Sequence, residues 1–386
     1  MHYNGGRNVV KQIVTNLNDL PIPVIHVSGC GEERGYQYGV QAKNLIIQSL
    51  KVYRDIVTKL RPDIIGWEAI QMEAKKMIPA IKRYDKELYL EIKGIAQGAQ
   101  RSIEEIVFLN ARSEIMNPAW ANVSVHEGCT TFALGSSWNS DQSILLGQTY
   151  DWNPECAKQL VLYLSCDEEG LEFATITEAG IIGKVGCNNY GIANLLNYLN
   201  NYDVNPHGTI YNVLLRRMLG SKSIYDAQRN LLRSPIAFGL NVLLADTNGY
   251  MIDYELTAQG TDFFFPNDDY LLHTNHYLSD KLSLRRFYKD AQQESVTRYE
   301  TAELFLYMRK GSITVDDLMQ LAAYHSCDQL YTSICRHGFT DAFGMETIFT
   351  IIMDLTYKKM YICIGIACKH QFYEIPFELL FTSYTK

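Results

Sequence analysis

A cysteine that follows a glycine begins the segment best suited to chemistry in this sequence. Gly128–Gly135 and Ile144–Trp152 have the β-branched and apolar residues of strands, and Ser136–Ser143 between them has the Ser, Asn, Asp and Gln of a hairpin loop. Paired residues in an antiparallel hairpin have a constant index sum. A loop centred near residue 140 therefore places Asp151 opposite Cys129, or within about two residues of it.

A carboxylate at this distance could hold an ammonium group. If the chain is cut before Cys129, that residue gains an α-amine of pKa about 7.7 to 8, which can accept the thiol proton and later return one. Gly128, without a Cβ, would let the thiol reach the preceding carbonyl through a strained backbone, so that cleavage proceeds through a thioester. Spacing alone leaves a second interpretation open, in which Cys129 is a buried strand cysteine and Asp151 a surface aspartate.

The surrounding pattern indicates the elements that must hold these residues. Apolar residues three and four apart predict helices between about Glu33 and Met116, and period-two and continuous apolar runs predict strands from Thr130 to Leu196. A strand is also expected at Ile181–Val185. Two helices, four strands, three helices and three strands then follow as far as Glu374. This order predicts an α+β fold with two mostly antiparallel sheets between helical layers, in a single domain 1–386.

Composition excludes several classes of partner. The chain of 386 residues is 47% hydrophobic and 20% charged, with a net charge of −8. Its Lys and Arg residues are scattered singly, so we expect no nucleic-acid partner and no anionic membrane surface. Met1–Leu20 is too polar for a secretory signal, and no run of about 18 apolar residues could span a bilayer. A soluble, cytoplasmic protein is therefore expected.

The nine cysteines are an odd number, contain no C-x-x-C pair and mostly lie in apolar runs. Apart from Cys129, they are expected to be reduced core residues. Neither a disulfide framework nor a zinc site has its usual spacing. His273 and His276 also lack a carboxylate or cysteine at ligand spacing, so we expect no metal and no cofactor.

A family resemblance favours the catalytic interpretation of Cys129. His126–Phe132 and Gly147–Trp152 resemble the self-processing site of the acyl-coenzyme A:6-aminopenicillanic acid acyltransferase family, whose members are N-terminal-nucleophile hydrolases related to penicillin V acylase and bile-salt hydrolase. Further segments similar to this family follow in the expected order: Gly31–Gly35 with Gly39, Glu91–Gly98, Leu109–Glu114, Asn188–Ala193, Asn241–Asp246, His273–His276 and Thr347–Asp354.

The resemblance implies a four-layer αββα fold and cleavage into chains 1–128 and 129–386 that stay associated. It implies that Cys129 is the nucleophile, that Asp151 orients the new amine, and that the amide of Asn241 completes an oxyanion hole. A strand asparagine bonded to backbone is the structural alternative at Asn241.

The resemblance also suggests residues around the substrate. Gln148 stands where the bile-salt branch carries arginine, and a neutral side chain would stabilise a thiolate less, which argues against a bile-salt substrate. Tyr150, Trp152 and Asn197 are further candidates for the pocket, although Asn197 could be a structural turn partner.

Three functions remain open. The first is a self-processing amidohydrolase or acyltransferase with a small acyl-amide or acyl-thioester substrate. The second is an autoproteolytic peptidase acting on a modified peptide or natural product, and the third is a catalytically silent binding protein of the same fold. The silent protein would remain an intact chain of 44.1 kDa.

Overall fold

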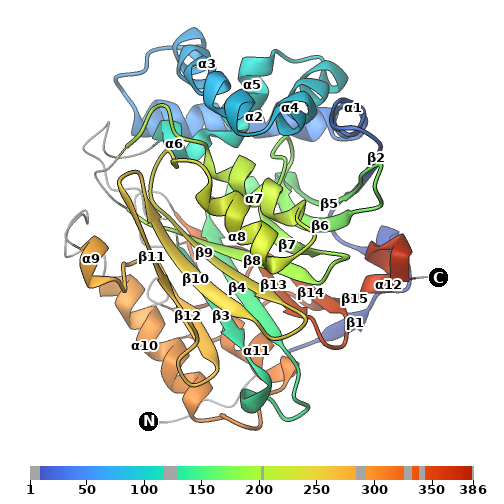
Figure 1. The fold of residues 1–386 in the computed structure, drawn as a ribbon, viewed down its shortest axis with the longest axis vertical. Helices are drawn as coiled ribbons and strands as arrows, with labels where there is room; N and C mark the ends of the chain where they lie inside the picture. Colours follow the sequence, from blue (N-terminus) through green and yellow to red (C-terminus); the bar gives the residue numbers. More distant parts are fainter. Residues whose placement is uncertain are drawn as a thin grey trace.

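Two sheets lie face to face between layers of helices, as the sequence predicted (Figure 1). The computed structural model describes residues 9–116, 128–200, 204–283, 293–325, 333–338 and 344–384. Helices from the first third of the chain, together with α7 and α8, lie on the side of one sheet, whereas α10 and α11 pack on the other. The α+β class and the αββα layering are confirmed.

The sheet that carries Cys129 has the strand order β1-β15-β14-β13-β4-β3-β12, and the second sheet has the order β11-β10-β9-β8-β7-β6-β5-β2. Within the described residues, only the pairs β1/β15 and β2/β5 are parallel. The strands are β1 (Lys11–Ile13), β2 (Val24–Ser28), β3 (Gly128–Leu134), β4 (Leu145–Trp152), β5 (Leu160–Cys166), β6 (Glu172–Glu178), β7 (Val185–Asn188), β8 (Ile192–Tyr198), β9 (Leu240–Asp246), β10 (Met251–Thr257), β11 (Gly260–Phe264), β12 (Tyr270–His273), β13 (Glu346–Asp354), β14 (Lys359–Ile364) and β15 (Phe372–Pro376).

Side chains cap the start of some of the helices. Ser102 and Glu105 form a capping box at α5, and Asp85 accepts two backbone N–H bonds at the start of α4. The helices are α1 (Gly31–Gln41), α2 (Lys43–Leu60), α3 (Trp67–Tyr84), α4 (Lys86–Ala99), α5 (Ile103–Asn110), α6 (Arg112–Met116), α7 (Tyr211–Leu219), α8 (Ile224–Leu232), α9 (Asp280–Ser283), α10 (Gln293–Tyr307), α11 (Val315–Ala322) and α12 (Phe377–Leu380). None of the helices in the described ranges is both long and apolar enough to cross a membrane.

One predicted strand is wrong. The segment 181–184 is irregular, and the strand begins only at Val185. Backbone amides of this segment bond to side chains instead of to a neighbouring strand: Ile182 N–H donates to Asn110 Oδ1, and Lys184 N–H donates to Thr175 Oγ1. The segment 181–184 is therefore a loop and not a strand, because side chains of other elements satisfy its backbone hydrogen bonds.

Four glycines explain the close crossing of α1 and α4. A Cβ on Gly35, Gly39, Gly94 or Gly98 would lie only 2.0–2.4 Å from a backbone oxygen of the facing helix. The two helices thus touch through their backbones, and any larger residue would separate them. The spacing of glycines in the family-like segments of this region is therefore a packing requirement.

Two buried charge clusters join the part of the chain before Gly128 to the part after it. Glu91 of α4 pairs with Arg216 of α7 at 2.8 Å and with Arg34 of α1 at 3.2 Å. The second cluster contains Arg112 of α6, Glu178 of β6 and Lys184.

Arg112 lies 3.2 Å from Glu178, which also pairs with Lys184. Burial by itself would raise the pKa of Glu178, but the charges of Lys184 and Arg112 outweigh it and lower the pKa to about 2. Breaking such a buried pair leaves an uncompensated charge, which costs about 3–5 kcal/mol.

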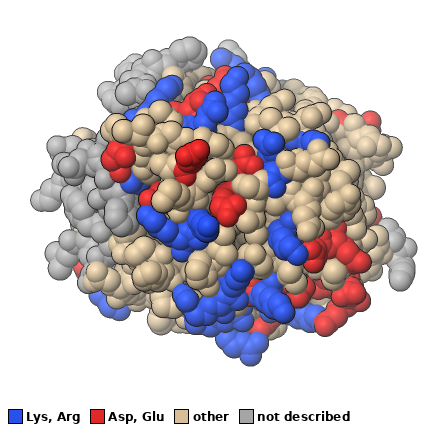
Figure 2. Space-filling model, turned by 90° about the horizontal axis from the view of Figure 1, so that it is seen from above, with Lys and Arg blue, Asp and Glu red and all other residues tan. Residues whose placement is uncertain are grey.

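The outer surface above the N-terminal helices mixes both charges. Figure 2 shows basic and acidic side chains next to one another on this face. This agrees with the single, scattered Lys and Arg residues of the sequence.

Candidate active site

The register of the β3/β4 hairpin places Asp151 opposite Gly128 and Tyr150 opposite Cys129. The sequence predicted Asp151 opposite Cys129 or within about two residues of it, so the observed partner, Gly128, lies one residue from the predicted position. Because side chains alternate between faces along a strand, the Cys129 thiol and the Asp151 carboxylate lie on opposite faces of the sheet. Cys129 packs in the core shared by both sheets, whereas the carboxylate faces the side covered by α10 and α11.

Three polar side chains hold the backbone of Cys129. Its N–H donates to Asn275 Oδ1 at 2.8 Å. Its carbonyl oxygen accepts from Arg298 Nη1 at 2.7 Å and from Asn197 Nδ2 at 3.2 Å. Arg298 Nη2 also donates to Asn275 Oδ1 at 2.8 Å. The peptide groups on both sides of the Cys129 Cα are thereby fixed by residues from β8, from the loop after β12 and from α10.

Asp151 is fully buried, so the interpretation as a surface aspartate is wrong. Its Oδ1 accepts from Thr347 Oγ1 at 2.6 Å, whereas its Oδ2 has no hydrogen-bond partner among the described residues. Burial raises the pKa of Asp151 to about 6, although the charges of Arg298 and Arg336 act in the opposite direction. A buried carboxylate oxygen without a donor is a place where a new ammonium group could bind.

Gly128 lies directly against this carboxylate. A Cβ at position 128 would be 2.6 Å from Asp151 Oδ2 and 2.9 Å from Arg336 Nη1. The glycine is needed for this close packing and not for a left-handed backbone, because its φ is not positive. We expected a strained backbone at Gly128. The structure gives another reason for the glycine, which is that no Cβ fits between position 128 and Asp151.

The predicted pocket residues are all buried, and most of their polar groups are hydrogen-bonded, whereas Gln148 Nε2 has no partner among the described residues. Gln148 Oε1 accepts from Leu196 N–H at 3.0 Å. The Tyr150 hydroxyl accepts from Arg112 at 2.9 Å and from Lys184 at 3.1 Å.

Trp152 Nε1 donates to the Tyr53 hydroxyl at 3.0 Å. Asn197 lies within β8, not in a turn, and its Oδ1 accepts from Thr131 Oγ1 at 2.7 Å. Asn197 contacts the Cys129 carbonyl, and a substrate role for Gln148, Tyr150, Trp152 and Asn197 stays a prediction.

Asn241 lies in β9, directly opposite Asn197 of β8. Its Nδ2 donates to Asp253 Oδ1 at 2.7 Å, so its partner is a carboxylate and not the backbone. Burial raises the pKa of Asp253 to about 7, opposed by the charge of His273. The oxyanion role of Asn241 stays a prediction.

Sequence reasoning missed two of the residues that touch Cys129. Asn275 lies in the segment His273–His276, where the conspicuous histidines drew attention away from the amide between them. A short polar segment directly after a strand was the available signal. Arg298 is a single arginine among the polar residues of helix α10, and nothing in its spacing distinguishes it from a surface residue.

Two helix-covered, mostly antiparallel sheets with a thiol at the start of an inner strand define an α+β protein of the αββα class. The family model described as acyl-coenzyme A:6-aminopenicillanic acid acyl-transferase matches residues 138–367. The chain is also 30% identical over 355 residues to the acyl-coenzyme A:6-aminopenicillanic-acid-acyltransferase 40 kDa form of Emericella nidulans, covering 89% of this chain and 93% of the relative. The chain therefore belongs to this family of acyltransferases and amidases, which confirms the resemblance.

More distant proteins are also similar. An uncharacterized protein of Archaeoglobus fulgidus is 22% identical over 352 residues, covering 78% of this chain and 57% of that protein. Penicillin V acylase from Agrobacterium tumefaciens has a TM-score of 0.47 at 12% identity, covering 66% of this chain and 89% of that one. A mutant of conjugated bile acid hydrolase from Clostridium perfringens has a TM-score of 0.36 at 14% identity, covering 61% and 89%.

Proposed function

We propose that this protein is a self-processing thiol enzyme that cuts its own Gly128–Cys129 bond and then uses Cys129 to cleave or transfer acyl groups. The observation that carries this proposal is the buried Asp151 Oδ2, which has no hydrogen-bond partner among the described residues and lies against Gly128. An ammonium group formed on Cys129 would supply the missing donor. The family membership supplies the reaction class.

Self-cleavage begins when Cys129 Sγ attacks the carbonyl carbon of Gly128. The C–N bond then breaks, the nitrogen takes up the proton that the thiol loses and becomes an amine, and a thioester joins Gly128 to the sulfur. Water hydrolyses the thioester, which leaves a carboxylate on Gly128 and a free thiol with an α-amine on Cys129. Asn275 Oδ1, already bonded to the Cys129 nitrogen at 2.8 Å, and Asp151 Oδ2 would then hold the ammonium form.

The mature residue would act as its own base. The α-amine takes the thiol proton, the thiolate attacks an amide or thioester carbonyl, and the ammonium returns the proton to the leaving group. Water or an acceptor amine then releases the acyl group from sulfur. Asn241 is our candidate donor to the oxyanion.

Cys129 is fully buried in the uncut chain. The thiol is therefore enclosed before cleavage, and a substrate from solution would reach it only after the bond at Gly128 has opened. This supports an inactive precursor. At one and the same pH, iodoacetamide should label Cys129 in the cut protein and not in an uncut, slowly cleaving Asp151→Asn variant, as peptide mass mapping would show.

The two products should stay together. The Glu91–Arg216 and Arg112–Glu178 pairs connect residues 1–128 to residues 129–386 and are almost completely buried. Separating the chains would expose unpaired charges and a large apolar core. One native particle that contains two chains is the expected form.

Intact mass spectrometry of the wild type and of Cys129→Ala tests the proposal. We expect the wild type to yield chains 1–128 and 129–386 that co-elute under native conditions, and Cys129→Ala to stay at 44.1 kDa. A wild type that remains whole and inactive would identify the silent binding protein instead. Hydroxylamine, which cleaves thioesters, should accelerate chain cutting if the thioester forms.

The relative in Emericella nidulans supports the choice of substrates to test, because its name specifies acyl-coenzyme A and 6-aminopenicillanic acid. Acyl thioesters, N-acyl amino acids and β-lactams should be assayed with and without acceptor amines. New amide products would indicate transfer, and free acid alone would indicate hydrolysis. Cleavage confined to modified peptides would favour the peptidase.

A further inference from the structure

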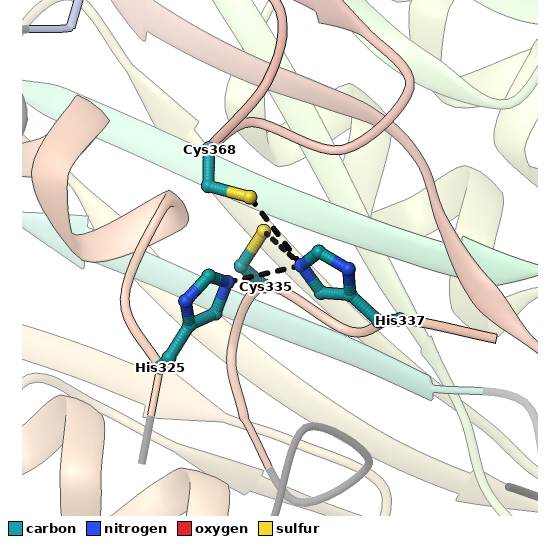
Figure 3. A group of neighbouring side chains, drawn as sticks. All are labelled: His325, Cys335, His337 and Cys368. Carbon is teal, nitrogen blue, oxygen red and sulfur yellow. Dashed lines mark hydrogen bonds between the residues drawn. The ribbon is translucent and has the colours of Figure 1, made fainter. Parts of the chain in front are cut away.

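Two histidines and two cysteines meet at a place separate from the thiol of Cys129. His325 follows α11, Cys335 and His337 lie in the segment 333–338, and Cys368 lies between β14 and β15. One ligand atom from each lies within 4.8 Å of the other three. Figure 3 shows the four side chains pointing toward a common centre.

Hydrogen bonding does not account for this arrangement. His337 Nε2 lies 3.0 Å from His325 Nε2, 3.3 Å from Cys368 Sγ and 3.9 Å from Cys335 Sγ. An imidazole nitrogen has one lone pair or one proton, so it makes one good hydrogen bond and not three. A single cation at the centre would use all four atoms.

The separations also match those of a tetrahedral metal site. Zinc bonds of about 2.3 Å to sulfur and about 2.0–2.1 Å to nitrogen place tetrahedral ligand atoms roughly 3.3–3.8 Å apart. The three distances around His337 Nε2, 3.0, 3.3 and 3.9 Å, bracket this range. Two thiolates and two imidazoles with no carboxylate are the donors that Zn²⁺ takes in structural sites.

We propose that His325, Cys335, His337 and Cys368 bind one structural Zn²⁺ ion. Binding releases the protons of the two thiols, whose negative charges neutralise the ion, and no electron is transferred. Cys335 and His337 are buried, while His325 and Cys368 are partly exposed, so the ion has an entry side. Four protein ligands leave no open position for a substrate.

The ion would also hold a segment that borders the cleavage site. Arg336 stands between two ligands, and its Nη1 would lie 2.9 Å from a Cβ on Gly128. Its backbone N–H donates to Thr347 Oγ1 at 2.9 Å, and that hydroxyl donates to Asp151 Oδ1. Zinc would thus fix Arg336 and Thr347 as positioning residues for Asp151.

The test measures metal in protein that has no histidine tag and was produced in zinc-supplemented medium. Elemental analysis should find about one zinc per chain in the wild type and the same in Cys129→Ala, since a mature N-terminal cysteine could itself chelate metal. The double variant Cys335→Ala/Cys368→Ala should lose the zinc. Cys363→Ala/Cys166→Ala is the matched control, because it also removes one buried and one partly exposed thiol, and it should keep the zinc.

Cobalt substitution tests the geometry even if the double variant does not fold. Apo wild type titrated with Co²⁺ should develop the strong visible absorption of tetrahedral thiolate coordination at about one equivalent. Three outcomes would overturn the proposal: wild type without zinc and without that absorption, zinc retained by the folded double variant, or a disulfide between Cys335 and Cys368 in protein kept under reducing conditions.

Discussion

Gly128→Ala should slow self-cleavage by disturbing the carboxylate beside the bond. The added methyl group would lie 2.6 Å from Asp151 Oδ2, whereas ordinary contacts of a Cβ begin at 3.4 Å. Asp151 or the backbone must therefore move by about 0.8 Å, and Arg336, at 2.9 Å, blocks part of the room. Overpacking of this kind costs about 1–3 kcal/mol.

If that cost acts on the transition state of cleavage, the rate falls about 5- to 150-fold, since about 1.4 kcal/mol corresponds to a factor of ten. The assay follows conversion of newly purified precursor into two chains by intact mass, together with the thermal midpoint. Gly260→Ala is the control, because its Cβ would meet Leu282 at an ordinary 3.5 Å.

A folded Gly128→Ala protein that cuts itself at the wild-type rate would refute the reasoning. In that case the contact between position 128 and Asp151 would have no part in the reaction. Loss of thermal stability with an unchanged rate would assign the glycine to packing alone.

Three further predictions concern Asp151, Asn275 and Asn241. The cleavage rate should rise with pH through about 6, the pKa to which burial raises Asp151, because only the ionised carboxylate can hold an ammonium group. Asp151→Asn should cut slowly at every pH and should lack this rise, and an unchanged pH profile in the variant would exclude Asp151 from the reaction. The contribution of Asp151 to the free energy of unfolding has the opposite pH dependence. Because its pKa is higher in the folded protein, this stabilisation is full below about pH 4 and is lost as the pH rises from about 4 to 6. Asn275→Ala should slow self-cleavage, because it removes the acceptor of the Cys129 N–H. Asn241→Ala should cut normally, but its acyl release in a single-turnover assay should be slower by about 3 kcal/mol, or roughly 10²-fold. Full turnover in this variant would remove Asn241 from the mechanism.

The layered fold and the hairpin that carries Cys129 were largely predictable, because both follow from local patterns. The two hairpin strands and their loop placed Asp151 within one residue of its observed register. A one-residue difference nevertheless moves a side chain to the other face, and index counting cannot decide between the faces. The strand predicted at Ile181–Val185 failed because its partners, Asn110 and Thr175, are invisible to a local pattern.

Residues that meet only in three dimensions were beyond sequence reasoning. Arg298 reaches Cys129 from a helix 169 positions later. The ligand spacing of the proposed zinc site was not recognised either, since Cys368 follows His337 by 31 residues and a whole hairpin lies between them. Spacing rules for zinc describe ligands on neighbouring turns, whereas these four come from two distant connections, α11 to β13 and β14 to β15.

The buried pairs that join α4 to α7 and α6 to β6 have a consequence for how the protein can be made. Because Glu91 and Arg216 pair across the proposed cleavage site, neither part of the chain has a complete interior of its own, and the proposed cut would be a nick within one folding unit. A gene that encodes residues 129–386 alone could yield an N-terminal cysteine once the initiator methionine is removed. It would still leave Arg216 without Glu91, and Glu178 without Arg112. If the proposed cleavage occurs, the precursor would be the template on which its own products become a stable pair.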